Sequence, residues 1–343
     1  MTKCTKIAFF EMEEWHTEYL RERCPPDWDL QIFGETLRPA TASLAEQAMV
    51  VSTFIYSEVT EDLMGKLSCL RLVCTRSTGY DHIDIAACRK RDILTSNVPR
   101  YGENTVAEHA FGLILSLSRK IYQAYQRTIR LDFSLQGLRG FDLKGKTIGV
   151  VGAGAIGLHV IRIAKGFGME VLACDARQQP LLAEVLGFRY VSLEDLLSNS
   201  DVISLHVPLI PETVHLINND TIRLIKKGAI LINTARGGVV DTGAIVTALN
   251  EGILAGAGLD VLEGEESIKE EAQLLGKELP VEKLRAIVQS YALLHRENVI
   301  ITPHIGFYSV EAEERILDTT IENIQGFLSG APRNLVSENP KPG

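Results

Sequence analysis

Short apolar runs alternate with amphipathic stretches between residues 146 and 304 of the chain. This alternation is typical of a parallel β-sheet whose strands are joined by crossover helices. The predicted strands are Thr147–Val151, Glu170–Cys174, Asp201–Val207, Ala229–Thr234, Leu254–Leu259 and Asn298–Thr302, with a shorter one at Phe188–Val191. The predicted helices between them are Ile156–Phe167, Leu193–Ser198, Thr221–Lys226 and Ala244–Asn250.

A weaker pattern of the same kind covers the N-terminal part of the chain. The stretch Val106–Arg119 that follows is apolar around much of its surface, so we expect it to be buried between domains or subunits. Because residues 146–304 already predict a complete sheet, we assign a last helix, Glu311–Leu328, to the N-terminal domain. The N-terminal elements are strands at Ile7–Phe10, Val50–Thr53, Leu72–Thr75 and Leu94–Asn97 and a helix at Glu61–Lys66.

Length and charge narrow the class of protein. The chain has 343 residues, enough for about two domains, and its 35 basic and 44 acidic residues give a formal net charge of −9, which argues against a nucleic-acid binder. No apolar run approaches the roughly 18 residues of a membrane span. The six cysteines form no Cys-x-x-Cys pair, and no residue spacing suggests a metal site. We therefore expect a cytoplasmic protein without nucleic-acid, membrane or metal partners.

A glycine-rich turn follows the first strand of the larger block. Gly152, Gly154 and Gly157 form a GxGxxG motif between a predicted strand and helix, and the next strand ends in Asp175. This arrangement binds a dinucleotide, with the diphosphate on the helix N-terminus and the carboxylate on the adenosine ribose. The charge of Asp175 would repel a ribose 2′-phosphate, so we expect NAD rather than NADP, although Arg177 nearby could accommodate that phosphate. FAD or S-adenosylmethionine are the alternatives for such a turn.

These patterns predict an α/β protein with two Rossmann-like domains, each a doubly wound parallel sheet, and an active-site cleft between them. The substrate-binding domain is expected to be discontinuous, comprising residues 1–101 and 306–343. The NAD-binding domain is expected to cover residues 102–305.

Polar side chains follow several predicted strands at their carboxyl ends, where ligands bind in open α/β sheets. Reduction of a keto acid needs a cation for the carboxylate and carbonyl, a proton donor that titrates near neutrality, and a carboxylate that favours the protonated donor. Arg236, His304 and Glu265 fit these roles in that order. The other polar residues at strand ends are His206, Thr234 and Asp260.

Alternatives to these roles exist among the neighbouring residues. His206 also follows a strand, but its place nearer the cofactor half of the sheet indicates a role in lining the NAD site. His109, on the apolar stretch, is expected to be a buried histidine with a satisfied hydrogen bond. Glu263, Glu265 and Glu266 share one loop, and the residues alone do not choose among them.

The motifs together resemble the D-isomer-specific 2-hydroxyacid dehydrogenase family over essentially the whole chain. The resemblance rests on Gly152–Gly157, His206-Val-Pro208, Asn233-Thr-Ala-Arg236-Gly237, Gly258-Leu-Asp-Val-Leu-Glu-Gly-Glu265, Thr302-Pro-His304, Thr78-Gly79-Tyr-Asp-His-Ile-Asp84 and Asn97-Val-Pro-Arg-Tyr101.

The resemblance implies roles for individual residues. It selects Glu265 as the catalytic glutamate, Arg236 as the substrate arginine and His304 as the acid/base. Asp260 would lie near the nicotinamide. The backbone amides of Thr78 and Gly79 would bind the substrate carboxylate. The further implied cofactor contacts are Ala155, Ile156, Asp175, Val207, Pro208, Thr213, Thr234 and Ala235.

Within the family the chain is most similar to the D-lactate dehydrogenase branch. Tyr101 and Phe307 match substrate-side residues of that branch, and the long segment Glu266–Glu297 is typical of it. Gly306 replaces a common alanine, which we expect to enlarge the pocket slightly, and Leu262 replaces a common aromatic residue. The implied activity is reduction of pyruvate to D-lactate by NADH in a homodimer. Glyoxylate, hydroxypyruvate, phosphoglycerate or branched-chain substrates remain alternatives, as does a non-catalytic NAD-sensing protein related to transcriptional corepressors.

Overall fold

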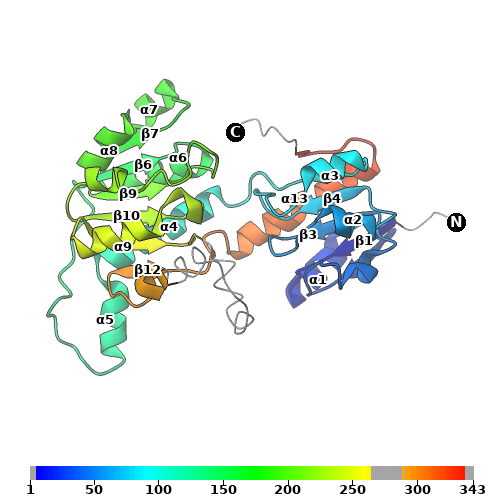
Figure 1. The fold of residues 1–343 in the computed structure, drawn as a ribbon, viewed down its shortest axis with the longest axis horizontal. Coiled ribbons are helices and arrows are strands. Elements are labelled where there is room, and N and C mark those ends of the chain that lie inside the picture. The colour runs from blue at the N-terminus through cyan, green and yellow to red at the C-terminus, as the bar shows by residue number, and fades with distance from the viewer. Residues whose placement is uncertain (1–4, 264–287, 290, 337–343) are drawn as a thin grey trace. The chain divides into compact units, whose positions relative to one another are not determined.

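The computed structural model describes residues 5–263, 288–289 and 291–336. The chain divides into two compact units, which are described separately (Figure 1). Unit 1 comprises Met1–Tyr101 and Ser309–Gly343, and unit 2 comprises Gly102–Tyr308. The chain therefore passes between the units twice, after Tyr101 and after Tyr308.

Unit 2 is built on a seven-stranded sheet in the order β12-β11-β10-β9-β6-β7-β8, with all neighbouring strands parallel. Buried apolar side chains lie on both faces of this sheet, as parallel strands require. The strands are β6 (Thr147–Val151), β7 (Glu170–Cys174), β8 (Arg189–Tyr190), β9 (Val202–Leu205), β10 (Ala229–Asn233), β11 (Leu254–Leu259) and β12 (Val299–Ile301). The described helices are α4 (Glu103–Ser118), α5 (Ile121–Thr128), α6 (Ala155–Gly166), α7 (Pro180–Leu186), α8 (Leu193–Asn199) and α9 (Thr242–Asn250).

Unit 1 has a five-stranded parallel sheet in the order β2-β1-β3-β4-β5. Its strands are β1 (Thr5–Phe9), β2 (Trp28–Ile32), β3 (Val50–Thr53), β4 (Leu72–Thr75) and β5 (Leu94–Ser96). Its helices are α1 (Glu14–Arg23), α2 (Glu61–Gly65), α3 (Ile85–Lys90) and α13 (Val310–Leu328).

Helix α13 and residues 334–336 complete unit 1. Helix α13 packs against β4 and α1, with Leu317 and Ile321 in the same apolar cluster as Ile7 and Leu72 (Figure 1). Beyond this helix, residues 334–336 bond the strand β5: the Asn97 N–H donates to the Asn334 carbonyl over 3.1 Å. Residues from the two ends of the chain thus share one core.

Side-chain caps explain where several helices begin. Asp241 accepts from the N–H groups of Gly243 and Ala244 at the start of α9, and Ser192 accepts from Asp195 at the start of α8. Such a cap satisfies N–H groups that a helix leaves without an intrahelical partner. Helix α6 differs, because Gly154 precedes it and no side chain among the described residues caps it.

The predicted fold class is confirmed, and most predicted strands of unit 2 agree with the structure to within one or two residues. Thr221–Lys226 was expected to be a helix but forms only a 3₁₀ turn, Thr221–Leu224, because the Asn218 side chain accepts from the backbone at residues 220 and 221 and Ile225 is already extended. Strand β2 and helix α1 were not predicted.

The apolar stretch in α4 is buried in part by its own unit. Ala110, Ile114 and Leu117 of this helix are buried, and the helix packs against α6, β10 and β11 of the same unit. Packing within unit 2 therefore accounts for the burial of these three side chains; burial against a second domain or subunit stays a prediction.

No helix in the described part of the chain is both long enough and apolar enough to cross a membrane.

Candidate active site

The glycine-rich turn joins β6 to α6 at the carboxyl edge of the sheet in unit 2. Gly152 has a φ of +93°, and a Cβ there would lie 2.7 Å from the carbonyl oxygen of His206. A Cβ at Gly157 would overlap the carbonyl oxygen of Gly152, whereas the Cβ position of Gly154 faces open space. The first and third glycines are thus required by packing, and the second leaves the uncapped start of α6, Ala155, open to an anion.

Asp175 follows the adjacent strand β7 and holds the glycine-rich turn. One carboxylate oxygen accepts from the Ala153 N–H and the other from the Arg177 N–H, each over 2.7 Å. The carboxylate therefore has a structural contact in addition to the ribose contact predicted for it.

The loop after β9 contacts the glycine-rich turn from the other side. A Cβ on Gly152 would lie 3.0 Å from Cγ1 of Val207, so the predicted cofactor residues Val207 and Pro208 border the turn. Further along, Thr213 Oγ1 accepts from the Ile210 N–H over 2.9 Å and closes the loop.

Two buried polar atoms beside this loop fit a bound dinucleotide. His206 Nδ1 and Thr234 Oγ1 are buried and have no hydrogen-bond partner in the described part of the chain. Buried polar groups are normally hydrogen-bonded, so a ligand with polar groups suits this edge. The uncapped helix α6, Asp175 and these two atoms together fit NAD.

His206 is unsuited to the role of proton donor. Its Nε2 lies 2.8 Å from Ser204 Oγ, and burial lowers the pKa of its ring to about 4. A ring with this pKa is neutral at physiological pH, so the structure agrees with its interpretation as a lining residue.

The turn after β10 presents Arg236. The buried side chain of Asn233 shapes this turn: its Oδ1 accepts from the Ala235 N–H over 3.0 Å, and its Nδ2 donates to the Arg236 carbonyl over 2.9 Å. The Arg236 Nη1 donates to the Ala235 carbonyl over 2.7 Å. No role was predicted for Asn233 from the sequence, although its position three residues before Arg236, at the end of a strand, could have indicated that it shapes this turn.

Asp260, at the end of β11, is buried and hydrogen-bonded by the loop that carries His304. Its Oδ1 accepts from Thr302 Oγ1 over 2.5 Å and from the Ile305 N–H over 3.0 Å, and its Oδ2 accepts from the Gly306 N–H over 2.8 Å. Burial raises the pKa of the carboxyl, but hydrogen bonds from His109, Thr302 and Gly306 outweigh burial and hold it below the ordinary value. In the structure Asp260 orders the loop; its contact with the nicotinamide stays a prediction.

His304 adopts a left-handed backbone conformation within this loop. Its φ is +57°, and its N–H donates to the Asp260 carbonyl over 2.9 Å. Non-glycine residues rarely adopt this conformation, and those that do are often held in place at functional sites. The ring stands edge-on to Phe307, with centroids 6.5 Å apart.

His109 and Glu263, two of the alternatives considered for the catalytic roles, each have a hydrogen-bond partner within unit 2. His109 Nε2 lies 3.0 Å from Thr302 Oγ1 and 3.3 Å from Asp260 Oδ1, so this histidine has the partner expected of it. Glu263 forms a hydrogen bond with His215. Glu265, Glu266 and most of the segment Glu266–Glu297 lie outside the described residues.

In unit 1, the loop after β4 carries Thr78 and Gly79. Asn97 Nδ2 donates to the Thr78 carbonyl over 2.8 Å, and Ser77 Oγ donates to the Gly79 carbonyl over 2.6 Å. The N–H groups of Thr78 and Gly79 donate to no other described residue, which suits a carboxylate ligand. Tyr101, also in unit 1, is held through its carbonyl by Arg315 Nε over 2.7 Å.

Arg76, a buried cation directly before the Thr78 loop, was not predicted to have a role. Arg76 donates to the carbonyl oxygens of Phe10 and Glu11 and to Ser52 Oγ, and burial lowers its pKa to about 10. It thereby ties the ends of β1, β3 and β4 together.

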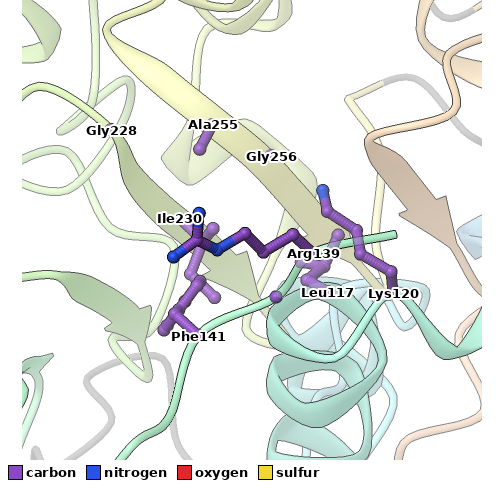
Figure 2. Close-up of a pocket in the computed structure, with 9 residues that line it drawn as sticks. Leu117, Lys120, Arg139, Phe141, Gly228, Ile230, Ala255 and Gly256 are labelled. Carbon is purple, nitrogen blue, oxygen red and sulfur yellow. The ribbon is translucent and has the colours of Figure 1, made fainter. Parts of the chain in front are cut away.

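A separate cavity of about 210 Å³ lies at the amino ends of β10 and β11, opposite the edge that carries the candidate site (Figure 2). Its lining includes Leu117, Lys120, Arg139, Ile230 and Gly256, and none of the predicted site residues.

Over the described ranges, no group of three or more His, Cys, Asp or Glu side chains is placed to hold a metal ion.

Comparison with known proteins gives the family. A family model described as "D-isomer specific 2-hydroxyacid dehydrogenase, NAD binding domain" matches residues 111–306. The chain belongs to the D-isomer-specific 2-hydroxyacid dehydrogenases. It is thus an NAD-dependent oxidoreductase that acts on D-2-hydroxy acids and their keto forms.

The similar proteins of this family are named for different substrates. A D-lactate dehydrogenase of Escherichia coli is 34% identical over 339 residues, covering 96% of this chain and all of the relative. A glyoxylate reductase of Thermococcus litoralis is 36% identical over 323 residues, 91% of each protein. A structure of D-lactate dehydrogenase from Aquifex aeolicus with NAD and lactic acid matches with a TM-score of 0.83 and 38% identity, covering 95% of this chain and 96% of that one.

The structure corrects the expectation that Gly306 enlarges the substrate pocket. A Cβ there would lie 2.8 Å from Asp260 Oδ2 and 3.5 Å from His109. A methyl group there would therefore press on the buried carboxylate of Asp260.

Replacing Gly306 by alanine should disturb Asp260. We expect Gly306→Ala to lower the free energy of unfolding by about 1–3 kcal/mol, the usual cost of overpacking, in a urea titration. The rate should fall for all keto acids alike. Unchanged stability with altered preference for longer keto acids would show that the methyl group does face the substrate.

Proposed function

We propose that this 2-hydroxyacid dehydrogenase reduces pyruvate to D-lactate with NADH. One observation carries the chemistry: Arg236, Asp260 and His304 follow β10, β11 and β12, which are adjacent strands of one sheet. Most of the predicted cofactor residues follow β6, β7 and β9 in the other half of the same edge, and Thr234 and Ala235 precede Arg236 in the turn after β10. Tyr101 and the D-lactate dehydrogenases among the relatives support pyruvate as the substrate.

Arg236 binds the substrate in this proposal. Its planar guanidinium donates two parallel hydrogen bonds to a carboxylate and can polarise the adjacent carbonyl as negative charge develops on its oxygen. The N–H groups of Thr78 and Gly79 hold the same carboxylate.

His304 transfers the proton. In reduction a protonated ring donates to the carbonyl oxygen of the keto acid, and in oxidation a neutral ring accepts the proton of the hydroxyl group. When bound, NADH would supply the hydride for reduction, and NAD⁺ would accept it in oxidation. A carboxylate at Glu265 favours the protonated ring and orients it.

Three finer assignments belong to the same proposal. Unit 2 is the NAD-binding domain and unit 1 the substrate-binding domain. Asp175 selects NAD over NADP. The unpaired thiols of the five described cysteines support a cytoplasmic location.

A homodimer is also part of the proposal. Helix α5 and the residues after it expose a row of large apolar side chains, with Leu131 and Leu135 more than 80% exposed. An exposed apolar patch of this kind marks an interaction surface, and a second copy of the chain is the proposed occupant. The row consists of Ile121, Tyr122, Tyr125, Ile129, Leu131, Phe133 and Leu135.

The substrate is tested by kcat/KM for a panel of keto acids with NADH. Pyruvate should exceed glyoxylate by about tenfold or more, because one methyl group in an apolar pocket contributes 1–3 kcal/mol. It should also exceed hydroxypyruvate, phosphohydroxypyruvate and a branched-chain keto acid, and a stereospecific assay should identify D-lactate. A higher value for another acid would replace pyruvate, and no turnover of any would favour an NAD-sensing protein.

Coenzyme choice is tested by Asp175→Asn. This change removes the charge and one of the two acceptors that hold the turn while keeping the size of the side chain. The preference for NADH over NADPH in kcat/KM should shrink about tenfold, or 1.4 kcal/mol. The matched control Asp142→Asn removes a charge from an exposed residue of the same unit and should change nothing. If the unaltered enzyme prefers NADPH, the repulsion argument is wrong and Arg177 is the residue to change next.

The dimer is tested by Leu131→Asp combined with Leu135→Asp in sedimentation velocity. The variant should sediment with the mass of one chain, 37.8 kDa, and the unaltered protein with twice that mass. Leu181→Asp, on α7 and 72% exposed, is the control and should leave the dimer intact. A variant that remains dimeric would place the interface elsewhere.

A further inference from the structure

Glu263 forms a side-chain cluster beside the candidate site to which no catalytic role is assigned above. Its Oε1 lies 2.6 Å from His215 Nε2, and its Oε2 accepts from Thr242 Oγ1 over 3.4 Å. The three residues come from three separate segments: the loop after β9, the start of α9 and the loop after β11. Glu263 is two residues before Glu265.

His215 is fixed by its backbone as well as by its ring. Its φ is +48°, its N–H donates to the Gly238 carbonyl over 2.8 Å, and its carbonyl accepts from Asn218 Nδ2 over 3.0 Å. A non-glycine residue keeps a left-handed conformation only where its surroundings enforce it. The ring of His215 is therefore a defined anchor for a carboxylate.

The segment that Glu263 belongs to is in direct backbone contact with the Arg236 turn. A Cβ on Gly237 would overlap the carbonyl group of Leu262 and lie 2.5 Å from the Glu263 nitrogen. Only glycine fits this contact, so residues 262–263 pack directly on the residue beside Arg236.

The ion pair itself contributes little to stability. The His215 side chain is 41% exposed and that of Glu263 is 33% exposed, and exposed pairs are weak because solvent screens them. Holding Arg236 in position, in contrast, has a large kinetic effect, because small displacements of catalytic groups reduce rates strongly.

We propose that Glu263, anchored by His215 and Thr242, is a positioning residue that holds the loop after β11 against the Arg236 turn. It thereby sets the place of the Arg236 guanidinium. The proposal rests on the substrate role proposed for Arg236.

The experiment compares Glu263→Gln, His215→Gln and the double variant in the full-length enzyme. Each single change should raise KM for pyruvate about ten- to hundredfold. KM for NADH should change less than KM for pyruvate, because the glycine-rich turn and Asp175 are untouched. The double variant should be no worse than the poorer single variant, because both changes break one contact. Glu251→Gln, which removes an exposed charge at the end of α9, is the matched control and should behave as the unaltered enzyme.

Hydrogen exchange of the peptide covering residues 259–263 gives a second readout that does not need turnover. Exchange there should be faster in both single variants and unchanged in the control. If the unaltered enzyme reduces no keto acid, the proposed function fails while this measurement still decides whether the contact holds the loop.

Two results would overturn the proposal. Unchanged exchange and unchanged KM in both single variants would reduce the cluster to a surface pair. A reduction rate profile that moves to lower pH in Glu263→Gln but not in His215→Gln would make Glu263 the carboxylate partner of His304 itself.

Discussion

The carboxylate of Asp260 ties the end of β11 to the loop that follows β12. Burying a charge is costly unless hydrogen bonds replace its hydration, and here Thr302, Ile305 and Gly306 supply them. Each of these donors would lose a buried partner if the carboxylate were absent, at roughly 1–3 kcal/mol per unsatisfied group. The carboxylate thus specifies a loop conformation that includes the left-handed backbone of His304.

This network reaches from the catalytic loop into α4. His109 of that helix lies against both Thr302 and Asp260, so the helix that follows Tyr101 and the loop that precedes Tyr308 share one buried carboxylate. The Arg236 turn has its own internal brace in Asn233, and the Leu262–Glu263 backbone packs on Gly237. Arg236 and His304 are therefore each held by a turn or loop that a neighbouring side chain braces.

How much the sequence predicts depends on the range of the interaction. The strand Thr147–Val151 and the glycine-rich turn are determined by neighbouring residues, and both were predicted. Strand β2 was missed although Trp28, Leu30 and Ile32 alternate with Asp29 and Gln31 as in a half-exposed edge strand, because five residues of alternation stand out less than the continuous apolar runs of the buried strands. The hydrogen bonds of Asp260 to residues 302–306 and of His215 to Glu263 join positions more than 40 residues apart, so no local pattern indicates them. Glu265 was selected only by family resemblance. The sign of the Gly306 effect could not be derived without knowing which way the missing Cβ points.

Helix α13 and residues 334–336 cover the sheet of unit 1, yet they are synthesised after all of unit 2. On the ribosome the first 101 residues therefore emerge with Ile7 and Leu72 lacking the partners Leu317 and Ile321. At roughly 5–20 residues per second, the intervening 200 or so residues take about 10–40 s to translate. During that interval the nascent chain carries an uncovered apolar sheet face, the kind of surface that chaperones bind, while unit 2 is contiguous and can fold as it leaves the exit tunnel.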